Sequence, residues 1–523
     1  MDFNIIFQSA RSIVIELLDA GIYQLENEYS VYINDKLYLN SKKIVQTIDN
    51  LKPDTVYDLY IELNGKKSKV TSFHTDIESY TLNVKEFGAK GDGERDDTVS
   101  IQAAIYACPK DGRVLVPKGI YKITSLFLKS DLRLELAEGA VLSAITDREK
   151  FPIFPGRIES YDESEEYYLG TWEGNPLDMF TGIITGLHIS NVMIYGKGSI
   201  DGNANIDNWW KNPKVRNIAW RPRLIFLSNC ENVTIQGISV KNSPSWNIHP
   251  YFSKNLKFID ISVTNPKDSP NTDGLDPESC ENVDIIGVYF SLGDDCIAVK
   301  SGKIYMGSKF KVSSEKITIR QCCMRDGHGS VTLGSEMAAG IKNLLVKDCL
   351  FLNTDRGLRI KTRRGRGKDA IIDDIIFENI KMDHVMTPFV INSFYFCDPD
   401  GRTEYVRTKE KLPVDERTPH IKKMKFKDIT CTNVHVAAAF AYGLPEQKIE
   451  KIEMENIKIS YTESPTADVP AMMEGIVPST KQGVYVNNIE TLDIMNVQIE
   501  GCVGEPITAE NVDNLIIDNK KMN

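Results

Sequence analysis

Four short polar segments in the middle of the chain carry the residue types that acid–base chemistry requires. They are Asn271-Thr272-Asp273, Gly293-Asp294-Asp295-Cys296, Gly327-His328-Gly329 and Arg359-Ile360-Lys361. Carboxyl groups can protonate a leaving oxygen and activate a water molecule, and a histidine can adjust their protonation. The two cations can hold an anionic sugar. Together these side chains predict acid–base cleavage of a glycosidic bond next to such a sugar.

The three carboxylates must lie close together and still leave room for a water molecule. Neighbouring turns of a strand-rich repeat lie about 4.8 Å apart, and inverting glycosidases separate their two carboxyl groups by roughly 6.5–9.5 Å. Asp294 and Asp295 would point in opposite directions on an extended strand, so we expect a bend, which Gly293 permits. Crowded negative charge at that bend is expected to raise one pKa and leave that carboxyl group protonated as the acid.

The elements that must position these residues repeat along the chain from about residue 180. One pattern, an asparagine followed by alternating apolar residues, recurs at irregular intervals. Its copies begin at Asn191, Asn232, Asn255, Asn282 and Asn343, with looser copies at Lys316, Lys423 and Lys451. Irregular repeats of this length indicate a solenoid with loop insertions on one face. Short strands without long helices between them predict a right-handed parallel β-helix in an all-β chain.

Three long stretches interrupt the repeats, at residues 145–180, 203–223 and 396–418. Long loops without a repeat pattern are usually functional in compact proteins. We expect these insertions to wall off one end of a groove that contains the acids.

Residues 1–77 form a separate unit of short alternating strands with turn residues between them. The segment Leu51-Lys52-Pro53-Asp54-Thr55-Val56-Tyr57 resembles the tyrosine corner of fibronectin type III domains, in which a tyrosine hydroxyl bonds back to nearby backbone. We therefore expect a fibronectin type III-like β-sandwich, followed by a β-helix domain over residues 80–523. A short amphipathic helix with Asp96 or Asp97 as its N-cap is expected to cover the first turn of that β-helix.

Composition excludes several other classes of protein. The 523 residues carry a formal net charge of −11, which argues against nucleic acid as a partner, because phosphate binding needs a basic face. No apolar stretch is long enough for a transmembrane helix, so no membrane partner is expected. The N-terminus has no signal-peptide pattern, which predicts a cytoplasmic protein, or a secreted one if the chain was trimmed. The ten cysteines are expected to be free thiols.

The four polar segments resemble the signature motifs of polygalacturonases, glycoside hydrolase family 28. The resemblance covers about residues 80–523 and includes all four motifs in order. It implies that Asp294 is the general acid and that Asp273 and Asp295 hold and deprotonate the attacking water. His328 is implied to hydrogen-bond within the cluster and to tune the protonation of the acid.

The same resemblance implies that Arg359 and Lys361 bind the galacturonate carboxylate at the cleavage site. Lys300 could add to the local positive charge. His249 lies in a segment that resembles a family stretch beside the active groove and is expected to contact substrate there, and Tyr395 could pack against a sugar ring. The histidines are scattered without metal-ligand spacing, so neither a metal nor a cofactor is expected.

These expectations lead to hydrolysis of α-1,4 links in polygalacturonate or its oligomers, with inversion. We favour exo action from a chain end, because the insertions could close the groove, and in this the chain resembles bacterial exo-polygalacturonases that carry a fibronectin type III-like domain. The alternatives are an endo-acting enzyme, a rhamnogalacturonan-type hydrolase of the same family, a pectate lyase, or a non-catalytic β-helix. The oligomeric state cannot be read from the sequence.

Overall fold

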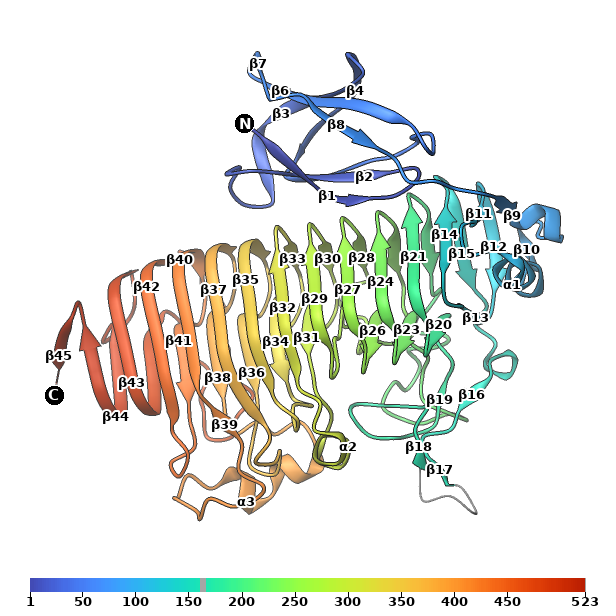
Figure 1. Cartoon of the computed structure of the whole chain (residues 1–523). Helices are drawn as coiled ribbons and strands as arrows, with labels where there is room; N and C mark the ends of the chain where they lie inside the picture. The colour runs from blue at the N-terminus through green and yellow to red at the C-terminus, as the bar shows by residue number, and fades with distance from the viewer. Residues whose placement is uncertain (160–165, 523) are drawn as a thin grey trace.

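The computed structural model describes residues 1–159 and 166–522, so residues 160–165 of the first insertion lie outside the described part. Figure 1 shows a small antiparallel module lying along one side of a long stack of parallel strands. The stack is a parallel β-helix, which confirms the predicted fold. Its chain coils so that each turn adds one strand to each of three stacks. None of the described helices is long and apolar enough to cross a lipid bilayer.

The N-terminal module consists of two antiparallel sheets. One sheet contains β1 (Phe3–Gln8), β2 (Ile13–Leu17) and β5 (Val45–Ile48), and the other contains β3 (Gln24–Ile33), β4 (Lys36–Lys43), β6 (Val56–Leu63), β7 (Lys66–Lys67) and β8 (Thr71–His74). The hydroxyl oxygen of Tyr57 accepts a hydrogen bond of 2.9 Å from the backbone N–H of Lys52, as a tyrosine corner would. The assignment to the fibronectin type III fold stays a prediction.

The β-helix begins where β9 (Thr81–Asn83) pairs with β11 (Arg113–Val116). Helix α1 (Thr98–Ala107) covers this end and buries Ile101, Ala104 and Ile105. Asp97 occupies the N-cap position, but its carboxylate accepts the backbone N–H groups of Lys90 and Gly91 instead of capping the helix. The side chain of Asp96 accepts the N–H of Thr98, the first residue of the helix. Asp96 therefore binds the start of the helix, whereas Asp97 binds the turn before it.

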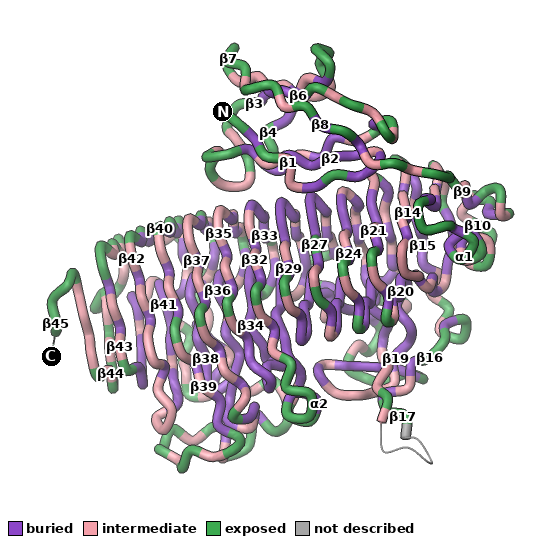
Figure 2. The backbone as a smooth tube through the Cα atoms, in the orientation of Figure 1, coloured by how far each residue is buried: buried purple, intermediate pink, exposed green. Residues whose placement is uncertain are grey.

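The first stack of the helix carries the repeat seen in the sequence. Its strands are β11 (Arg113–Val116), β14 (Leu132–Leu136), β21 (Ser190–Gly196), β24 (Glu231–Gln236), β27 (Lys254–Ile259), β29 (Glu281–Ile286), β32 (Ser314–Arg320), β35 (Ile341–Leu352), β37 (Ile371–Asp383), β40 (Lys423–Val434), β42 (Ile449–Tyr461), β43 (Gln482–Glu500) and β44 (Ile507–Ile517). Parallel register aligns one inward-facing aliphatic side chain per turn. This ladder runs through Val192, Val233, Leu256, Val283, Ile317, Leu344 and Ile375. Figure 2 shows the buried interior that results.

The asparagine that opens each copy of the repeat lies in the left-handed backbone region. Asn255 and Asn282 have φ angles of 55° and 57°, and Lys316 occupies the same conformation with φ 55°. Asparagine tolerates this region better than most residues. The side-chain amide of Asn282 also donates a 2.7 Å hydrogen bond to the side chain of Asn255 on the turn before it. The repeat pattern therefore reflects a turn conformation as well as the inward-facing strand residues.

The second and third stacks complete each turn. The second contains β10 (Asp92–Asp96), β12 (Gly119–Ile123), β15 (Ala140–Ala144), β22 (Ser199–Asp201), β25 (Ser239–Lys241), β28 (Ser262–Thr264), β30 (Tyr289–Ser291) and β33 (Cys323–Arg325). The third contains β13 (Leu126–Phe127), β20 (Ile184–Leu187), β23 (Ile225–Ser228), β26 (Ile248–Tyr251), β31 (Ile297–Val299), β34 (Val331–Gly334), β36 (Arg356–Lys361), β38 (Thr387–Asn392) and β41 (Ala437–Tyr442). The predicted catalytic segments all lie at this third stack.

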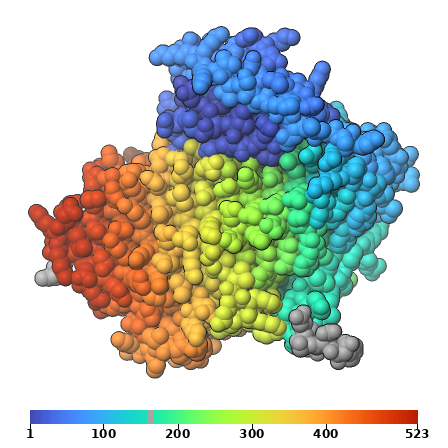
Figure 3. All heavy atoms as spheres, viewed as in Figure 1, coloured from blue at the N-terminus to red at the C-terminus, as the bar shows by residue number. Residues whose placement is uncertain are grey.

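The module packs against the first stack, on a different face from the insertions (Figure 1). The centre of the contact is apolar, with Phe7, Val14 and Val45 against Ile259 and Ile286. Figure 3 shows the module seated along the middle rungs of the helix.

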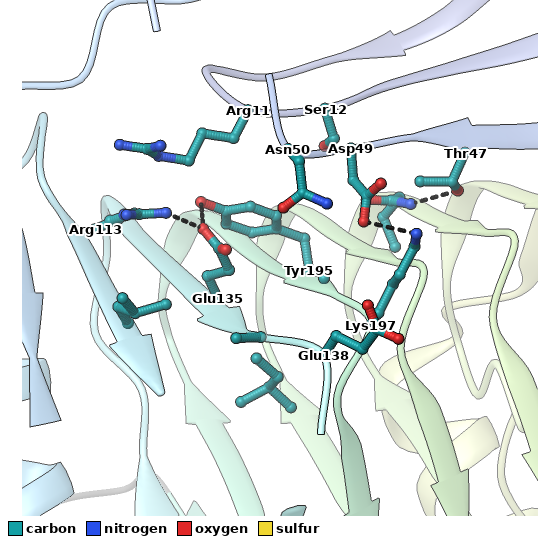
Figure 4. Close-up of a pocket in the computed structure, with 15 residues that line it drawn as sticks. Arg11, Ser12, Thr47, Asp49, Asn50, Arg113, Glu135, Glu138, Tyr195 and Lys197 are labelled. Carbon is teal, nitrogen blue, oxygen red and sulfur yellow. Dashed lines mark hydrogen bonds and ion pairs between the residues drawn. The ribbon is translucent and has the colours of Figure 1, made fainter. Parts of the chain in front are cut away.

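Charged and polar groups surround a cavity of about 210 Å³ at this interface (Figure 4). Lys197 of the helix pairs with Asp49 of the module at 2.9 Å, and the hydroxyl of Tyr195 donates to Glu135 at 2.9 Å. The Lys197–Asp49 pair crosses from the helix to the module, as does the pair of Lys43 with Asp260 at 2.7 Å, and both help to fix the position of the module.

Candidate active site

Three successive turns of the β-helix bring the acids and the histidine together. Asp273 lies just before Leu275, whose backbone bridges β26 and β31. Asp294 and Asp295 immediately precede β31, and His328 precedes β34. Each of these residues lies in the segment just before a strand or bridge, at the same edge of the third stack. The register of the parallel strands therefore gathers side chains that are far apart in the sequence.

The adjacent aspartates occupy a bend at Gly293 and Asp294, as the sequence predicted. Gly293 is required there by close packing: a Cβ atom would lie 2.6 Å from the backbone oxygen of Ser269. Gly329 is needed for a similar reason, because a Cβ atom would lie 2.9 Å from a carboxylate oxygen of Asp295. The glycines of these motifs let neighbouring turns approach the carboxylates closely.

One carboxylate oxygen from each of Asp273, Asp294 and Asp295 lies within 4.8 Å of the other two. Asp295 is fully buried and Asp273 is 4% exposed, whereas Asp294 is half-buried. The described residues contain no other such group of three potential metal ligands. Lys300, Arg359 and Lys361 already supply positive charge to this cluster.

Asp295 is held between two cations of β36. Arg359 Nη1 contacts one carboxylate oxygen at 3.0 Å, and Lys361 Nζ contacts the other at 2.8 Å. Burial acts to raise the pKa of Asp295, but the charges of Lys361 and Arg359 outweigh it and hold that pKa well below its usual range. Asp295 is therefore ionised. The two cations predicted to bind substrate line the cavity and also neutralise this carboxylate.

Asp273 has the opposite environment. Burial, followed by the nearby charge of Asp294, raises its pKa well above the usual range. Lys300 Nζ is 4.0 Å from Asp273 and makes a closer contact of 3.1 Å with Glu336. The sequence predicted a raised pKa within the Asp294–Asp295 pair. In the structure the pKa of Asp295 is lowered, because Asp295 has two cations of its own, and the raised pKa is that of Asp273.

His328 is about half exposed at the mouth of the cluster. Its Nδ1 atom lies 2.7 Å from a carboxylate oxygen of Asp355, and the two side chains are 53% and 47% exposed. The backbone N–H of His328 donates to the carbonyl oxygen of Asp294 at 3.1 Å. The structure thus places His328 beside the carboxylate cluster, with Asp355 as a partner that the sequence did not reveal.

The remaining predicted binding residues differ in their access to the cavity. Lys300 and Tyr395 line it, and Lys361 Nζ lies 5.7 Å from the centre of the Tyr395 ring. His249 has no exposed surface, and its Nε2 atom contacts Glu278 at 2.9 Å. The prediction that His249 contacts substrate directly was therefore wrong. Its ring lies beneath the groove because β26 directs it into a buried network with Arg223.

The cluster opens into a cavity of about 500 Å³. The first and third insertions meet on one side of it at Lys303. The backbone N–H of Lys303 donates to the carbonyl oxygen of Gly174 at 3.2 Å, and its ammonium group lies 3.3 Å from Asp398. Both Glu173 and Asp398 line the cavity. Two of the predicted insertions are thus joined into one wall.

The second insertion packs against this wall and also reaches the cavity. Trp220 stacks on Trp172 of the first insertion with ring centres 4.7 Å apart. Arg221 donates a 2.7 Å hydrogen bond to the side chain of Asn271, next to the acids. Lys214, at the tip of this insertion, lines the cavity. The three insertions therefore act as one assembly around the site.

With this geometry in view, comparison with known proteins decides the family. The model of glycosyl hydrolases family 28 matches residues 166–476, more than half of the chain. The chain belongs to glycosyl hydrolases family 28. A second model, of the rhamnogalacturonase A/epimerase, pectate lyase-like type, matches residues 81–134 at the start of the helix.

Relatives within family 28 extend over most of the chain. A probable polygalacturonase from Vitis vinifera is 29% identical over 81% of this chain and 86% of its own length. An endo-polygalacturonase from Pectobacterium carotovorum subsp. carotovorum is 28% identical over 69% of this chain and 84% of its own length. The structure of a family 28 exopolygalacturonase from Yersinia enterocolitica aligns over 98% of both chains with a TM-score of 0.69 and 19% identity, a likeness of fold.

Several residues of this family 28 site were absent from the sequence prediction. Glu336 pairs with Lys300, and Asp355 pairs with His328. A fourth insertion, residues 462–481, places the sulfur of Met472 2.9 Å from Arg359 Nη2. Arg356 holds this insertion through the carbonyl oxygens of Val469 and Pro470. Among these residues, only Asp355 could have been found from the sequence, because it is an acid four residues before Arg359 of a recognised motif.

Proposed function

We propose that the protein is an exo-acting polygalacturonase, which hydrolyses α-1,4-galacturonosidic bonds of polygalacturonate or oligogalacturonides from a chain end with inversion. The observation that carries this proposal is the junction at Lys303, where the insertions that contain Gly174 and Asp398 meet beside the carboxylate cluster. A polymer running through the groove would have to pass this wall, whereas a chain end can stop against it.

Each side chain of the cluster suits one task in this reaction. Asp294 is half-buried and lines the cavity, so it can reach the glycosidic oxygen as the general acid. Asp295 is kept ionised by its two cations and can accept a proton from the attacking water. Asp273 helps to hold that water. Arg359 and Lys361 line the cavity and can bind the carboxylate of the sugar.

The stereochemistry of the reaction needs a measurement of its own. The closest oxygens of the acids lie within 4.8 Å, below the roughly 6.5–9.5 Å that separates carboxyl groups in inverting enzymes. The nearest oxygens of two carboxyl groups lie closer together than the groups as wholes, and the proposal of inversion rests on the family resemblance. Proton NMR of the first product tests it. Inversion predicts the β anomer at the earliest times, and the α anomer would overturn it.

The product pattern from saturated tri- to hexagalacturonate, followed over time by chromatography, tests the proposed function. Exo action predicts mono- or digalacturonate with the shortened chain from the earliest point. A spread of intermediate oligomers would mean endo action, the activity named for the Pectobacterium relative. An unsaturated product would indicate a lyase. Absence of cleavage, with cleavage of rhamnogalacturonan fragments in the same assay, would move the substrate to the other pectin backbone.

We also propose that the enzyme acts in the cytoplasm on imported oligosaccharides. All ten cysteines are free thiols, and eight of them are buried. Unpaired cysteines fit a reducing compartment, where disulfides rarely persist. Fractionation of cells that express the natural gene, with detection by antibody, would place the protein. Recovery in the culture medium would contradict the proposal.

A further inference from the structure

An acid, a histidine and a second acid follow one another on three successive turns at the groove. They are Asp294 before β31, His328 before β34 and Asp355 directly before β36. Backbone hydrogen bonds hold the three in line. The N–H of His328 donates to the carbonyl oxygen of Asp294 at 3.1 Å, and the N–H of Asp355 donates to the carbonyl oxygen of Gly327 at 2.9 Å. This column is a fixed feature of the strand register.

Asp355 forms a hydrogen bond with one of the two ring nitrogens of His328. Its carboxylate oxygen lies 2.7 Å from Nδ1, so Nδ1 carries a proton toward Asp355. The other nitrogen, Nε2, is left for the cavity that both residues line. A carboxylate bound to one nitrogen fixes the orientation of an imidazole and makes the ring more basic.

We propose that Asp355 is a positioning residue, which keeps His328 in its protonated form and turns its Nε2–H group toward Asp294 and the bound sugar. The catalytic consequence rests on the proposed function, whereas the charge state of His328 does not. An imidazolium beside the general acid would stabilise Asp294 after it has given its proton to the leaving oxygen.

The charges around the pair favour this state. His328 faces Asp355 on one side and Asp294 and Asp295 on the other, and its pKa is raised, first by the hydrogen bond to Asp355 and then, against its burial, by these charges. Burial acts to raise the pKa of Asp355, but the hydrogen bond and charge of His328, together with Arg356 and Arg359, lower it.

Arg356 also fixes the backbone of Asp355. Its Nη1 atom donates to the carbonyl oxygen of Asp355 at 2.9 Å, while the rest of the guanidinium holds the fourth insertion. The position of Asp355 is therefore set independently of its contact with His328. A substitution that keeps the shape of the side chain, Asp355→Asn, should change the charge and leave this framework intact.

The chain offers a matched control in the pair Asp383 and His384. A carboxylate oxygen of Asp383 lies 3.0 Å from Nδ1 of His384, and the side chains are 41% and 45% exposed. Neither residue lines the cavity. Asp383→Asn therefore removes an acid–histidine contact of similar geometry and exposure away from the reaction.

The test is an NMR titration of the full-length protein with 13C-labelled histidine rings, in the wild type, Asp355→Asn and Asp383→Asn, with His328→Gln to assign the signal. We expect the pKa of His328 to fall toward about 6.5, the value of free histidine, in Asp355→Asn and to stay unchanged in Asp383→Asn. The alkaline limb of the kcat profile on trigalacturonate should move to lower pH by the same interval in Asp355→Asn. Asp355→Glu should restore both values.

An unchanged pKa of His328 in Asp355→Asn would overturn the proposal, and so would a shifted pKa with an unmoved alkaline limb. A fall in thermal stability without either shift would show that Asp355 is merely structural and would also overturn it. If the wild type failed to cleave galacturonate oligomers, the proposed function would fail, while the NMR result would still decide the charge state of His328.

Discussion

At the scale of single residues, Asp273 and Asp295 share one cluster but have opposite electrostatic environments. Asp295 lies between Arg359 and Lys361, and its pKa is depressed although burial opposes this. Asp273 is buried beside another carboxylate, and its pKa is raised. Ionised Asp295 therefore stabilises the folded protein, whereas ionising Asp273 costs free energy. Sites that retain such a cost often trade stability for activity.

This contrast predicts opposite effects of two similar substitutions. Asp295→Asn should lower the free energy of unfolding at pH 7 by on the order of 1–3 kcal/mol, because two cations lose their partner. Asp273→Asn should raise it. Both should lower kcat by roughly 10²–10⁴-fold, the usual contribution of an acid–base group. Urea unfolding and initial rates measure the two effects.

The pH dependence of these two stability differences is a control on the electrostatic explanation. The stabilising charge of Asp295 is present above the ordinary aspartate pKa of about 3.9 and is lost as the pH falls through its lower folded-state value. The protonated form of Asp273 costs nothing below the ordinary aspartate pKa, and the cost grows as the pH rises from that value toward the raised folded-state value. Both differences from the wild type should shrink as the pH falls below about 4. Equal effects of the two substitutions at pH 7 would contradict this account.

At the scale of elements, the left-handed asparagines should contribute in two separable ways. Asn255→Ala loses the hydrogen bond from Asn282 and strains the backbone at φ 55°. Asn255→Gly loses the same side-chain hydrogen bonds, from Asn282 and to Glu231, without the backbone strain. We expect the alanine variant to lose about 1–2 kcal/mol more than the glycine variant, the cost of the left-handed region for a residue with a Cβ. Equal losses in urea unfolding would mean that the conformation is not the reason for the asparagine.

The wall of the groove can be tested through Gly174. A Cβ atom there would lie 2.7 Å from the backbone nitrogen of Lys303, at φ +72°, so Gly174→Ala should push the two insertions apart. We expect a larger share of intermediate oligomers among the products. Gly475→Ala is the matched control, because Gly475 also has a positive φ, +84°, but open space around it. An unchanged product pattern in Gly174→Ala would remove the wall as the cause of the proposed exo action.

Prediction from sequence succeeded for these elements where the information is local. The asparagine of each repeat indicates the left-handed backbone conformation that it adopts itself, and Gly293 predicted the bend beside the aspartates. The contact between Met472 and Arg359 is different, because it depends on the path of the insertion at 462–481, which has no repeat and no motif. The contact between Asp355 and His328 depends on the register of β34 against β36, which the irregular spacing of the repeats does not define. The burial of His249 depends on the buried partners toward which β26 directs its side chain, Arg223 and Glu278, which lie far from it in the sequence.

At the scale of the whole molecule, the N-terminal module and the groove occupy different faces of the helix. Val45 of the module packs on Gly287, where a Cβ atom would lie 2.6 Å from it. Val45→Asp should lower the free energy of unfolding by about 2–5 kcal/mol, because it buries a charge in an apolar contact. The product pattern should not change. Val56 of the module is 64% exposed, so Val56→Asp is the control. It should change neither the free energy of unfolding nor the product pattern. A changed product pattern in Val45→Asp would mean that the module influences the site.

The central claim is that a groove closed at Lys303 delivers chain ends to the three carboxylates. The most direct measurement compares the viscosity of a polygalacturonate solution with the number of reducing ends released over the same time. Removal of sugars from chain ends predicts that reducing ends accumulate while the viscosity falls only slowly. A collapse of viscosity after few bonds have been cut would require cleavage inside the polymer, and it would contradict the closed groove.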